Sequence, residues 1–215
     1  MDEFEKTKRT KLVRAAQRGH YDHKTVHAIL DEALICHVGT VIDGKPAVIP
    51  TAHWRQDNRL YIHGSKASRM LRAAQGSEVC IAVSLMDGLV MARSGFHHSI
   101  NYRSVIVYGV ADLVEDAAEK LDALELFMEK IAPGRWPELR PATDKEIKST
   151  TVLAVDLKEV SAKIRTGPPV DDEPDYALPI WAGVVPTRLT LGEPIADPRL
   201  AEGVEIPAYL LPEAS

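Results

Sequence analysis

Apolar residues recur at helical spacing in two parts of the chain. In the first, Asp22 precedes apolar positions that share one helical face: Val26, Ile29, Leu30, Ala33 and Leu34. This pattern predicts a helix over about residues 23–34 with Asp22 as its N-cap. In the second, Asp116 and Glu119 have capping-box spacing before another such face: Leu121, Leu124, Met128 and Ile131. We expect this helix to end at Pro133-Gly134, and a third, short helix to cover about 66–75.

The other apolar runs are short or alternate, and turn residues separate them. These β-type runs cover residues 35–42, 47–55, 59–63, 79–86, 89–93, 105–114, 150–157 and 160–164. Asp43-Gly44 between the first two is a strong hairpin signal, and we interpret Asp87-Gly88 as a second turn. The pattern predicts six or seven antiparallel strands with two or three peripheral helices. It therefore favours a mainly β fold, in the form of a small barrel.

The character of the sequence changes at Pro168. Nine of the 14 prolines lie between this residue and the end of the chain. Proline cannot donate to a central sheet ladder, so this part should wrap the surface as an ordered tail or reach a second subunit as an arm. We therefore divide the chain into an N-terminal arm (1–22), a barrel domain (23–167) and a Pro-rich tail (168–215).

Composition and charge narrow the class of protein. Of the 215 residues, 45% are apolar and 27% are charged, which allows a sizeable core. The net charge of −5 argues against a nucleic-acid surface, and we expect the basic residues of the arm to be solvated. Cys36 and Cys80 each lie in an apolar run, which indicates reduced core thiols. Without a signal-peptide pattern or a membrane-length apolar run, we expect a cytoplasmic protein that does not bind a membrane.

Residues 94–104 are unusually rich in hydrogen-bonding side chains and run directly into an apolar strand. The polar residues are Ser94, His97, His98, Ser99, Asn101, Arg103 and Ser104. Such a segment fits a solvated loop, or a set of donors that holds a polar ring or an anion at the mouth of a sheet.

A second polar cluster follows the third predicted strand. The strand stops at Gly64, a helix begins, and Ser65, Lys66, Ser68 and Arg69 surround its first turn. This arrangement predicts a phosphate pocket, although Ser65 as a cap with solvated cations explains it equally well. The absence of GxxxxGK[ST] and GxGxxG argues against nucleoside triphosphates and Rossmann-type dinucleotide binding. His53, His63 and His97 have no common ligand spacing, so we expect no metal site.

Six short runs in order resemble one known family. They are Ile49-Pro50-Thr51-Ala52-His53, Leu60-Tyr61-Ile62-His63-Gly64-Ser65, Asp87-Gly88-Leu89-Val90, Asn101-Tyr102-Arg103-Ser104-Val105, Ser161-Ala162-Lys163-Ile164-Arg165-Thr166-Gly167-Pro168 and Trp181-Ala182-Gly183-Val184-Val185-Pro186. The chain resembles the pyridoxamine 5′-phosphate oxidase-like, FMN-binding split-barrel family. It is most similar to the bacterial flavin-nucleotide-binding branch, which is related to the nitroimidazole-resistance proteins.

The resemblance implies a split β-barrel homodimer with FMN in the subunit interface. One subunit would supply residues 50–53 and 63–69, and Arg103 and Ser104 would approach from its neighbour. Arg103 or Arg55 would stabilise the reduced flavin, and Trp181 would lie near the ring. The expected FMN-binding residues are Pro50, Thr51, Ala52, His53, His63, Gly64, Ser65, Lys66, Ser68, Arg69, Asn101, Tyr102, Arg103, Ser104 and Trp181.

The chain departs from the authentic oxidases at its C-terminal end, where it lacks their Arg-x-His motif for the substrate phosphate. Oxidation of pyridoxamine phosphate is therefore not expected. The resemblance favours an FMN-dependent oxidoreductase of an unknown small molecule, with NAD(P)H as a possible donor and no catalytic side chain assigned. Two alternatives stay open: a flavin carrier or sensor without turnover, and a relative that binds haem or deazaflavin.

Overall fold

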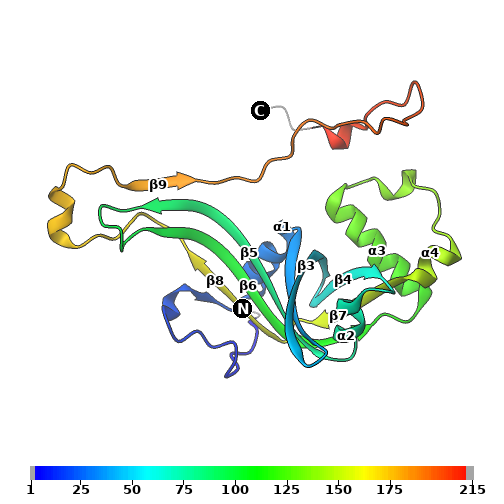
Figure 1. Ribbon diagram of the computed structural model, residues 1–215, viewed down its shortest axis with the longest axis horizontal. Coiled ribbons are helices and arrows are strands. Elements are labelled where there is room, and N and C mark those ends of the chain that lie inside the picture. Colours follow the sequence, from blue (N-terminus) through cyan, green and yellow to red (C-terminus); the bar gives the residue numbers. More distant parts are fainter. Residues whose placement is uncertain (1–2, 212–215) are drawn as a thin grey trace.

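The computed structural model describes residues 3–211, and an antiparallel sheet closed into a ring forms its centre (Figure 1). The ring consists of β2 (Ile35–Ile42), β3 (Lys45–Gln56), β4 (Arg59–Ser65), β5 (Glu78–Met91), β6 (Ser99–Leu113) and β7 (Thr150–Asp156). Its order is β6-β7-β4-β3-β2-β5, and β5 pairs again with β6. Closure leaves these six strands without a free edge. The predicted antiparallel barrel is confirmed.

Three further strands lie outside the ring. β8 (Glu159–Arg165) pairs with β6, and the two-residue β1 (Gly19–His20) pairs with β8. β9 (Gly183–Pro186) pairs with the far end of β5. Strands also change partners along their length, because β3 pairs with β2 over residues 45–52 and with β4 over residues 53–56. These changes of partner split the barrel, and seven longer strands with two short ones match the six or seven predicted.

Four α-helices accompany the barrel: α1 (His23–Glu32), α2 (Arg69–Ala74), α3 (Ala117–Ile131) and α4 (Asp144–Ser149). The predicted caps are present, since Asp22 accepts from Thr25 N and Asp116 accepts from the backbone at the start of α3. Helix α4 was not predicted, although it begins with a capping box between Thr143 and Glu146. Short 3₁₀ turns cover Ala16–Arg18, Trp136–Glu138, Glu173–Ala177 and Ala208–Leu210.

The interpretation of Asp87-Gly88 as a turn was wrong. β5 continues through both residues as one strand, with a bulge between Met86 and Gly88. The carboxylate of the extra residue, Asp87, is held by Arg103 on β6, and this fixes the bulge within the sheet. The polar segment is likewise only partly a loop, because β6 begins at Ser99. β5 and β6 therefore form one long ribbon that extends away from the barrel (Figure 1).

Two apolar clusters stabilise the fold. The larger lies inside the ring, where α1 inserts Val26, Ile29 and Leu30 among the strands. The smaller lies on the outer side of the sheet, between its strands and α3, and comprises Trp54, Tyr61, Val114, Ala123, Val152 and Ala154. Helix α3 covers this part of the sheet. Trp54, which would otherwise be exposed there, is therefore only 1% exposed.

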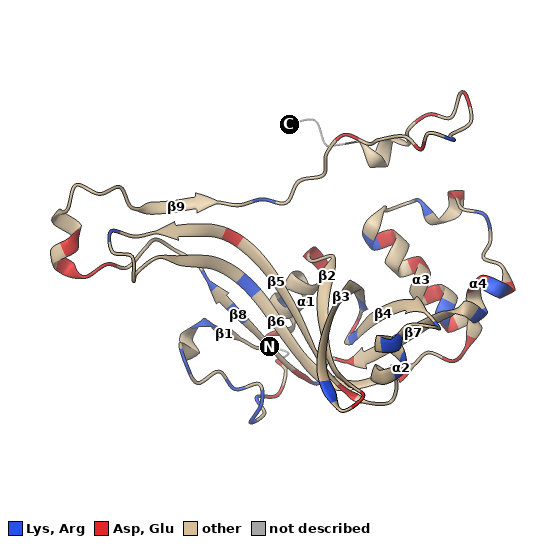
Figure 2. Cartoon of the chain, viewed as in Figure 1, with Lys and Arg blue, Asp and Glu red and all other residues tan. Residues whose placement is uncertain are grey.

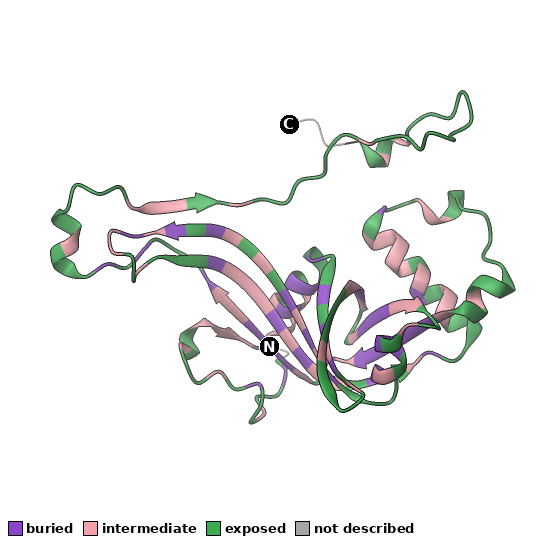
Figure 3. Ribbon diagram, in the orientation of Figure 1, coloured by how far each residue is buried: buried purple, intermediate pink, exposed green. Residues whose placement is uncertain are grey.

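The arm and the tail behave differently. The arm is not simply solvated: Phe4 is buried against the ring of His23, with 3.9 Å between ring centroids, and Arg9 pairs with Glu78 and Glu159. The tail is mostly exposed over its described residues 168–211, where its one strand is the short β9 at an edge of the sheet (Figure 3). Residues 1–2 of the predicted arm and 212–215 of the predicted tail lie outside the described part.

Two smaller expectations concern the cysteines and membranes. Cys36 and Cys80 are both free thiols, and burial raises the pKa of Cys36 to about 12. Within residues 3–211, no helix is both long and apolar enough to span a bilayer.

Candidate functional site

Strand register brings two of the predicted segments onto one outer face. Pro50 pairs with His37 on β2, His37 pairs with Ala82 on β5, and Ala82 pairs with Ile106 on β6. Because residues two apart on a strand share a face, Pro50 and Ala52 lie on the same face of the sheet as Tyr102 and Ser104. The exposed side chains of Ile35, Val41, Val48, Pro50 and Met86 also belong to this face. We call it the outer face of β3-β2-β5-β6.

Arg103 points to the opposite side of β6, toward α1. It donates to Asp87 at 2.7 and 3.0 Å and to Glu32 at 2.7 Å. These bonds lower the pKa of Glu32, and the pKa of Arg103 is raised by the same two carboxylates. The positive charge of Arg103 is therefore matched within the chain. Asn101, also predicted, is buried and bridges Gly167 O, at 3.1 Å, and the guanidinium of Arg165.

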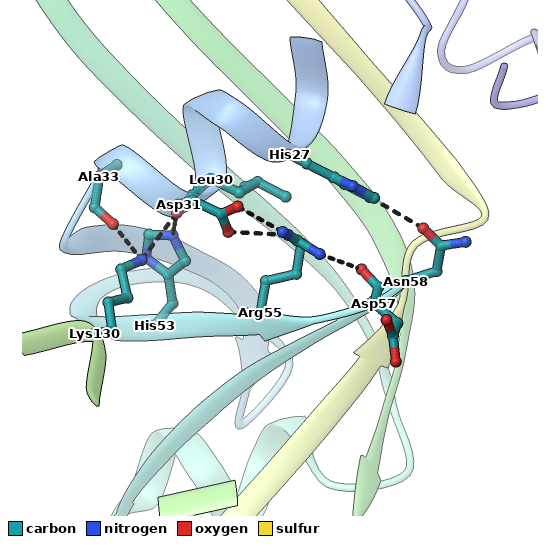
Figure 4. A network of polar contacts seen from close by, with 9 residues as sticks. All are labelled: His27, Leu30, Asp31, Ala33, His53, Arg55, Asp57, Asn58 and Lys130. Carbon is teal, nitrogen blue, oxygen red and sulfur yellow. Dashed lines mark hydrogen bonds and ion pairs between the residues drawn. The ribbon is translucent and has the colours of Figure 1, made fainter. Parts of the chain in front are cut away.

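His53 of β3 joins the barrel to α1 instead of facing the outer surface. It is fully buried, and its Nε2 lies 3.0 Å from Leu30 O (Figure 4). Burial and the nearby charge of Lys130 lower the pKa of His53 to about 4, so the imidazole is neutral at pH 7. Since a carbonyl only accepts, Nε2 carries the proton and donates. Thr51 and Ala52 beside it are half-buried and Pro50 is exposed.

Lys130 and Arg55 lie in the same polar network (Figure 4). Lys130 Nζ donates to Leu30 O at 2.9 Å and to Ala33 O at 2.6 Å, so a cation satisfies carbonyls at the C-terminal end of α1. Burial lowers the pKa of Lys130 to about 8. Arg55 donates to both carboxylate oxygens of Asp31, at 3.0 and 2.5 Å. Neither flavin-tuning candidate, Arg55 nor Arg103, thus has an unmatched charge within the chain.

The hydroxyls of the turn after β4 cap the local backbone. Ser65 Oγ accepts from Ala67 N at 3.2 Å, and Ser68 Oγ accepts from Leu71 N at 3.3 Å as the N-cap of α2. Gly64 allows a close approach, because a Cβ there would lie 3.1 Å from Leu71 Cδ1. The cap therefore lies at Ser68, three residues after the position that the sequence analysis considered.

Lys66 and Arg69 do not share a pocket. Arg69 pairs with Asp43 at 3.1 Å and borders a pocket of about 700 Å³ beside the β2–β3 hairpin. The pocket is lined by Ile42, Asp43, Lys45, Pro46, Ala47, Ile49, Ser68, Arg69 and Met70. Lys66 borders two hollows on the side of α4, and no residue of either hollow lines the Arg69 pocket. The predicted phosphate cluster thus separates into two cationic places.

His63 lies against α3, on the smaller apolar cluster. Its ring centroid is 5.4 Å from that of Trp54 and 4.6 Å from that of Phe127. His63 Nδ1 and Trp54 Nε1 are buried, and neither has a hydrogen-bond partner in the part of the chain that the structure describes. Burial lowers the pKa of His63, so its imidazole is neutral near pH 7. It lines a pocket of about 270 Å³ with Leu121, Leu124, Phe127, Met128, Trp136, Ala142, Glu146, Ile147 and Thr150.

The polar tip between β5 and β6 holds the start of the tail. The buried Asp171 accepts from Arg93 N at 3.0 Å and from Arg93 Nη1 at 2.9 Å. His97 Nδ1 lies 3.7 Å from Asp171, and His98 Nδ1 lies 2.9 Å from Ser94 O. Asp171 with His97 and Asp175 has metal-ligand spacing, but its charge is already matched by Arg93. This part of the segment therefore fixes the start of the tail to the tip of the β5–β6 ribbon.

Trp181 lies on the tail at this distal end, next to β9. Its ring lies close to Gly183, where a Cβ would come within 3.1 Å of the indole, and Gly183 pairs with Met91 of β5. The indole is 68% exposed. Within one chain, Trp181 therefore belongs with the ribbon tip, whereas the Arg69 pocket belongs to the barrel.

The fold and these surfaces define a class: a split-barrel protein with an open, largely apolar sheet face beside cationic pockets. Residues 22–164 match the pyridoxamine 5′-phosphate oxidase family, and the chain belongs to this family. The predicted membership is thereby confirmed. None of the curated proteins matches the sequence significantly.

Solved structures of similar proteins extend the comparison. The flavocytochrome Anf3 from Azotobacter vinelandii is 44% identical, with 95% of each chain covered and a TM-score of 0.91. An FAD- and haem-binding protein from Mycobacterium smegmatis is 34% identical, with 90% of this chain and 95% of that chain covered and a TM-score of 0.85. A candidate 5-nitroimidazole resistance protein from Bacteroides thetaiotaomicron is 23% identical, covers 68% of this chain and 86% of its own, and shares the fold with a TM-score of 0.56.

Proposed function

We propose that this protein is a flavin-dependent redox protein that acts as a homodimer. The observation that carries the proposal is its correspondence over 95% of both chains, at 44% identity, with a flavocytochrome. The second relative, at 34% identity, binds FAD and haem. FMN, the expected cofactor, is also the flavin-bearing part of FAD. When bound, a flavin would accept electrons as a pair and release them singly or as a pair.

The Arg69 pocket fits the phosphate of a flavin. Arg69 and Lys45 supply positive charge, and Ser68 keeps a hydroxyl hydrogen to donate. The pair between Arg69 and Asp43 is 72% and 84% exposed at its two side chains, so the guanidinium can exchange the carboxylate for a phosphate at little cost. Of the residues that line this pocket, Pro46 belongs to the outer face by strand alternation, whereas Ile49 lies on the opposite face of β3. At this pocket the chain would bind the phosphate and shield one side of the ring.

A second copy of the chain explains the exposed apolar surface. Val41 is 61% exposed and Val48 is 65% exposed on the outer face. Leu189, Leu191 and Ile195 of the tail are 88%, 82% and 96% exposed. Val41 and Val48 lie together on adjacent strands, and contiguous exposed apolar surface of that kind marks an association site. A dimer through the outer face would bring Tyr102 and Ser104 of the partner's ribbon toward a flavin on β3.

Haem is a second candidate ligand, and the unpaired ring nitrogens in the small apolar cluster favour it. His63 Nδ1 and Trp54 Nε1 lack partners, although buried polar atoms are nearly always hydrogen-bonded. The neighbouring pocket of about 690 Å³ shares Leu121, Trp136, Ala142 and Glu146 with the His63 pocket. A neutral imidazole in an apolar, aromatic pocket could serve as a haem ligand. We propose that His63 would ligate haem, which would supply one-electron chemistry.

The absorbance spectrum of the purified protein tests both ligands. We expect twin flavin bands and a Soret band, with the Soret band absent in His63→Ala and the flavin bands retained. Flavin bands alone would remove the haem proposal. A single deazaflavin band, or a colourless protein that gains no spectrum with added FMN, FAD or haem, would remove the flavin proposal.

Reduction kinetics separate an enzyme from a carrier. NAD(P)H should bleach the bound flavin within the time of a catalytic cycle if the protein is an oxidoreductase. Slow bleaching by every donor would assign the protein to the carrier or sensor class.

A further inference from the structure

Strand β8 continues the outer face of β3-β2-β5-β6 and adds two cations to it. Arg165 pairs in register with Tyr102 of β6, and Lys163 pairs with Ser104. Because residues paired across two strands share a face, both cations lie on the face that carries Tyr102 and Ser104. Figure 2 shows basic segments on β8 and next to β1, the short strand that pairs with it.

The charge of Arg165 is buried and unmatched within the described chain. Arg165 is only 8% exposed, and with residues 3–211 its guanidinium donates to two neutral oxygens, Asn101 Oδ1 and Pro168 O, and forms no ion pair. Burial lowers the pKa of Arg165, and the nearby positive charge of Arg18 lowers it further. A buried charge costs free energy unless an opposite charge accompanies it. An anion bound here would therefore remove an unfavourable feature of the fold.

Hydrogen-bond donors also remain available beside this charge. The guanidinium of Arg165 has more N–H groups than its bonds to Asn101 and Pro168 use. The side chain of Tyr102 lies opposite on β6, and its hydroxyl makes no hydrogen bond within residues 3–211. The planar fork of an arginine matches the two oxygens of a carboxylate, and a phenol can donate to one of them. Arg165 and Tyr102 thus suit a carboxylate.

The surface next to Tyr102 is apolar. Met86 of β5 pairs with Tyr102, and Leu89 pairs with Ile100, which lies two residues before Tyr102 and shares its face. Met86, Leu89 and Ile100 are 52%, 40% and 44% exposed. A ligand at this place would meet a cation at one end and apolar side chains at the other. This combination fits an acid with an apolar body better than it fits a phosphate.

We propose that Arg165 and Tyr102 bind the carboxylate of a small apolar acid, and that such acids are the substrate class of the protein. The proposal rests on the flavin-dependent redox function, because the dimer proposed above brings Tyr102 of one subunit toward a flavin on β3 of the other. Arg165 would arrive with Tyr102, since the two are paired on one face. The carboxylate would stay at β8 and the apolar body would lie toward the flavin ring. Arg18 and Lys163 add long-range attraction for the anion.

Calorimetric titration with benzoate tests the site directly. Arg165→Gln removes the charge but keeps a donor for Asn101, and it should weaken benzoate binding about tenfold or more. Arg72→Gln removes the same charge at an exposed position on α2 and should bind benzoate as the wild type does. Equal benzoate affinity in Arg165→Gln and the wild type overturns the proposal. So does wild-type binding of benzamide, which lacks the charge, or of inorganic phosphate that is as tight as that of benzoate.

Two milder variants keep the test decisive if Arg165→Gln does not fold. Tyr102→Phe removes one hydroxyl and leaves every described contact of Arg165 with Asn101 and Pro168 in place. Arg18→Gln removes the neighbouring charge and should, like Tyr102→Phe, weaken benzoate binding about threefold. Unchanged benzoate affinity in both variants overturns the proposal.

Flavin titration separates the acid site from the cofactor site. Arg165→Gln should bind FMN and FAD as the wild type does, and benzoate should shift the flavin absorbance of the wild type but not of this variant. Lost flavin affinity with unchanged benzoate affinity in Arg165→Gln would place Arg165 in the flavin site and overturn the proposal. If the wild type binds no flavin while benzoate binding still depends on Arg165, the redox function fails and the acid site stands.

Discussion

The distal β5–β6 ribbon and the turn after β4 are both rich in polar residues, yet their charges meet different partners. In the ribbon, Arg93 is matched by Asp171, and Arg103 is matched by Asp87 and Glu32. Around the turn, Lys66 and Arg72 line hollows on the side of α4 and make no ion pair with any residue of 3–211. A high density of donors therefore does not identify a ligand site by itself. What distinguishes the two regions is whether the chain also provides the acceptors.

The largest predicted effect appears in acid, at the buried His53 of β3, before the ion pairs of the ribbon respond. The unfolded chain protonates His53 near its ordinary pKa of 6.5, whereas the folded protein does so only near 4. The unfolded state therefore binds more protons as the pH falls from 6.5 toward 4, and the free energy of unfolding decreases over that window by about 2–3 kcal/mol. The ion pair between Glu32 and Arg103 of the ribbon is lost at lower pH. Because the pKa of Glu32 is lowered, this pair stops stabilising the fold only below about pH 4.5.

The acid contrast is measured by urea unfolding at pH 7 and pH 4.5. His53→Asn cannot titrate but keeps a donor for Leu30 O, so its stability should fall less than that of the wild type. His37→Asn changes an exposed imidazole and serves as the control. If the free energy of unfolding falls equally with pH in the wild type and in His53→Asn, His53 does not cause the loss of stability in acid.

Removing Arg103 should affect the stability of the ribbon and not flavin binding. Arg103→Met leaves Asp87 and Glu32 close together without a cation, and we expect the free energy of unfolding to fall by about 1–2 kcal/mol. The estimate is modest because the Arg103 side chain is 28% exposed. Arg188→Met, at an exposed position, is the matched control. Unchanged stability together with lost flavin affinity would contradict the assignment and place Arg103 in the flavin site.

The unpaired imidazole of His63 predicts a gain in stability for the haem-free protein. His63→Leu removes a buried nitrogen that has no partner, and we expect the free energy of unfolding to rise by about 1 kcal/mol. Thermal unfolding of the haem-free protein measures the change, with His37→Leu as the exposed control. A clear loss of stability would mean that His63 has a favourable interaction in the absence of a ligand.

Substitution of Arg69 should have the smallest effect on stability but a clear effect on flavin binding. Arg69→Gln breaks an exposed pair with Asp43, so unfolding should change by no more than about 0.5 kcal/mol. Flavin affinity should nevertheless fall about tenfold, because a charge-assisted phosphate contact is lost. Fluorescence titration measures the affinity, with Lys24→Gln as the charge-matched control. Unchanged affinity would remove the phosphate assignment.

Helices and strands were predictable from the sequence where one local pattern determines them. β2 occupies the predicted residues 35–42, because alternation and the Asp43-Gly44 turn specify both its face and its end. Asp87-Gly88 misled the prediction because a bulge and a hairpin turn use the same residues, and only Arg103 on the next strand distinguishes them. The capping box of Thr143 and Glu146 was a local signal for α4 that the analysis overlooked.

The candidate site was less predictable because its parts depend on distant contacts. Serine and cation spacing marked residues 65–69, but the direction of Arg69 depends on Asp43 and that of Lys66 on the position of α4. Similarly, nothing local shows that Arg103 pairs with Glu32, 71 residues earlier in the chain. Sequence therefore located the polar residues, while tertiary contacts decided which of them stay available for a ligand.

Beyond β9, the described part of the tail is attached to the body at two separated points. Thr187 Oγ1 donates to Met86 O at 2.6 Å, and Tyr209 interacts with Arg135 at 3.0 Å and with Glu138. The segment between them is a tethered loop whose conformational entropy is already reduced by closure. Its apolar side chains are thus presented at a high effective concentration, and a binding partner has less disorder to remove than it would with a free tail. The segment from Thr187 to Tyr209 is therefore held at both of its ends before any partner binds.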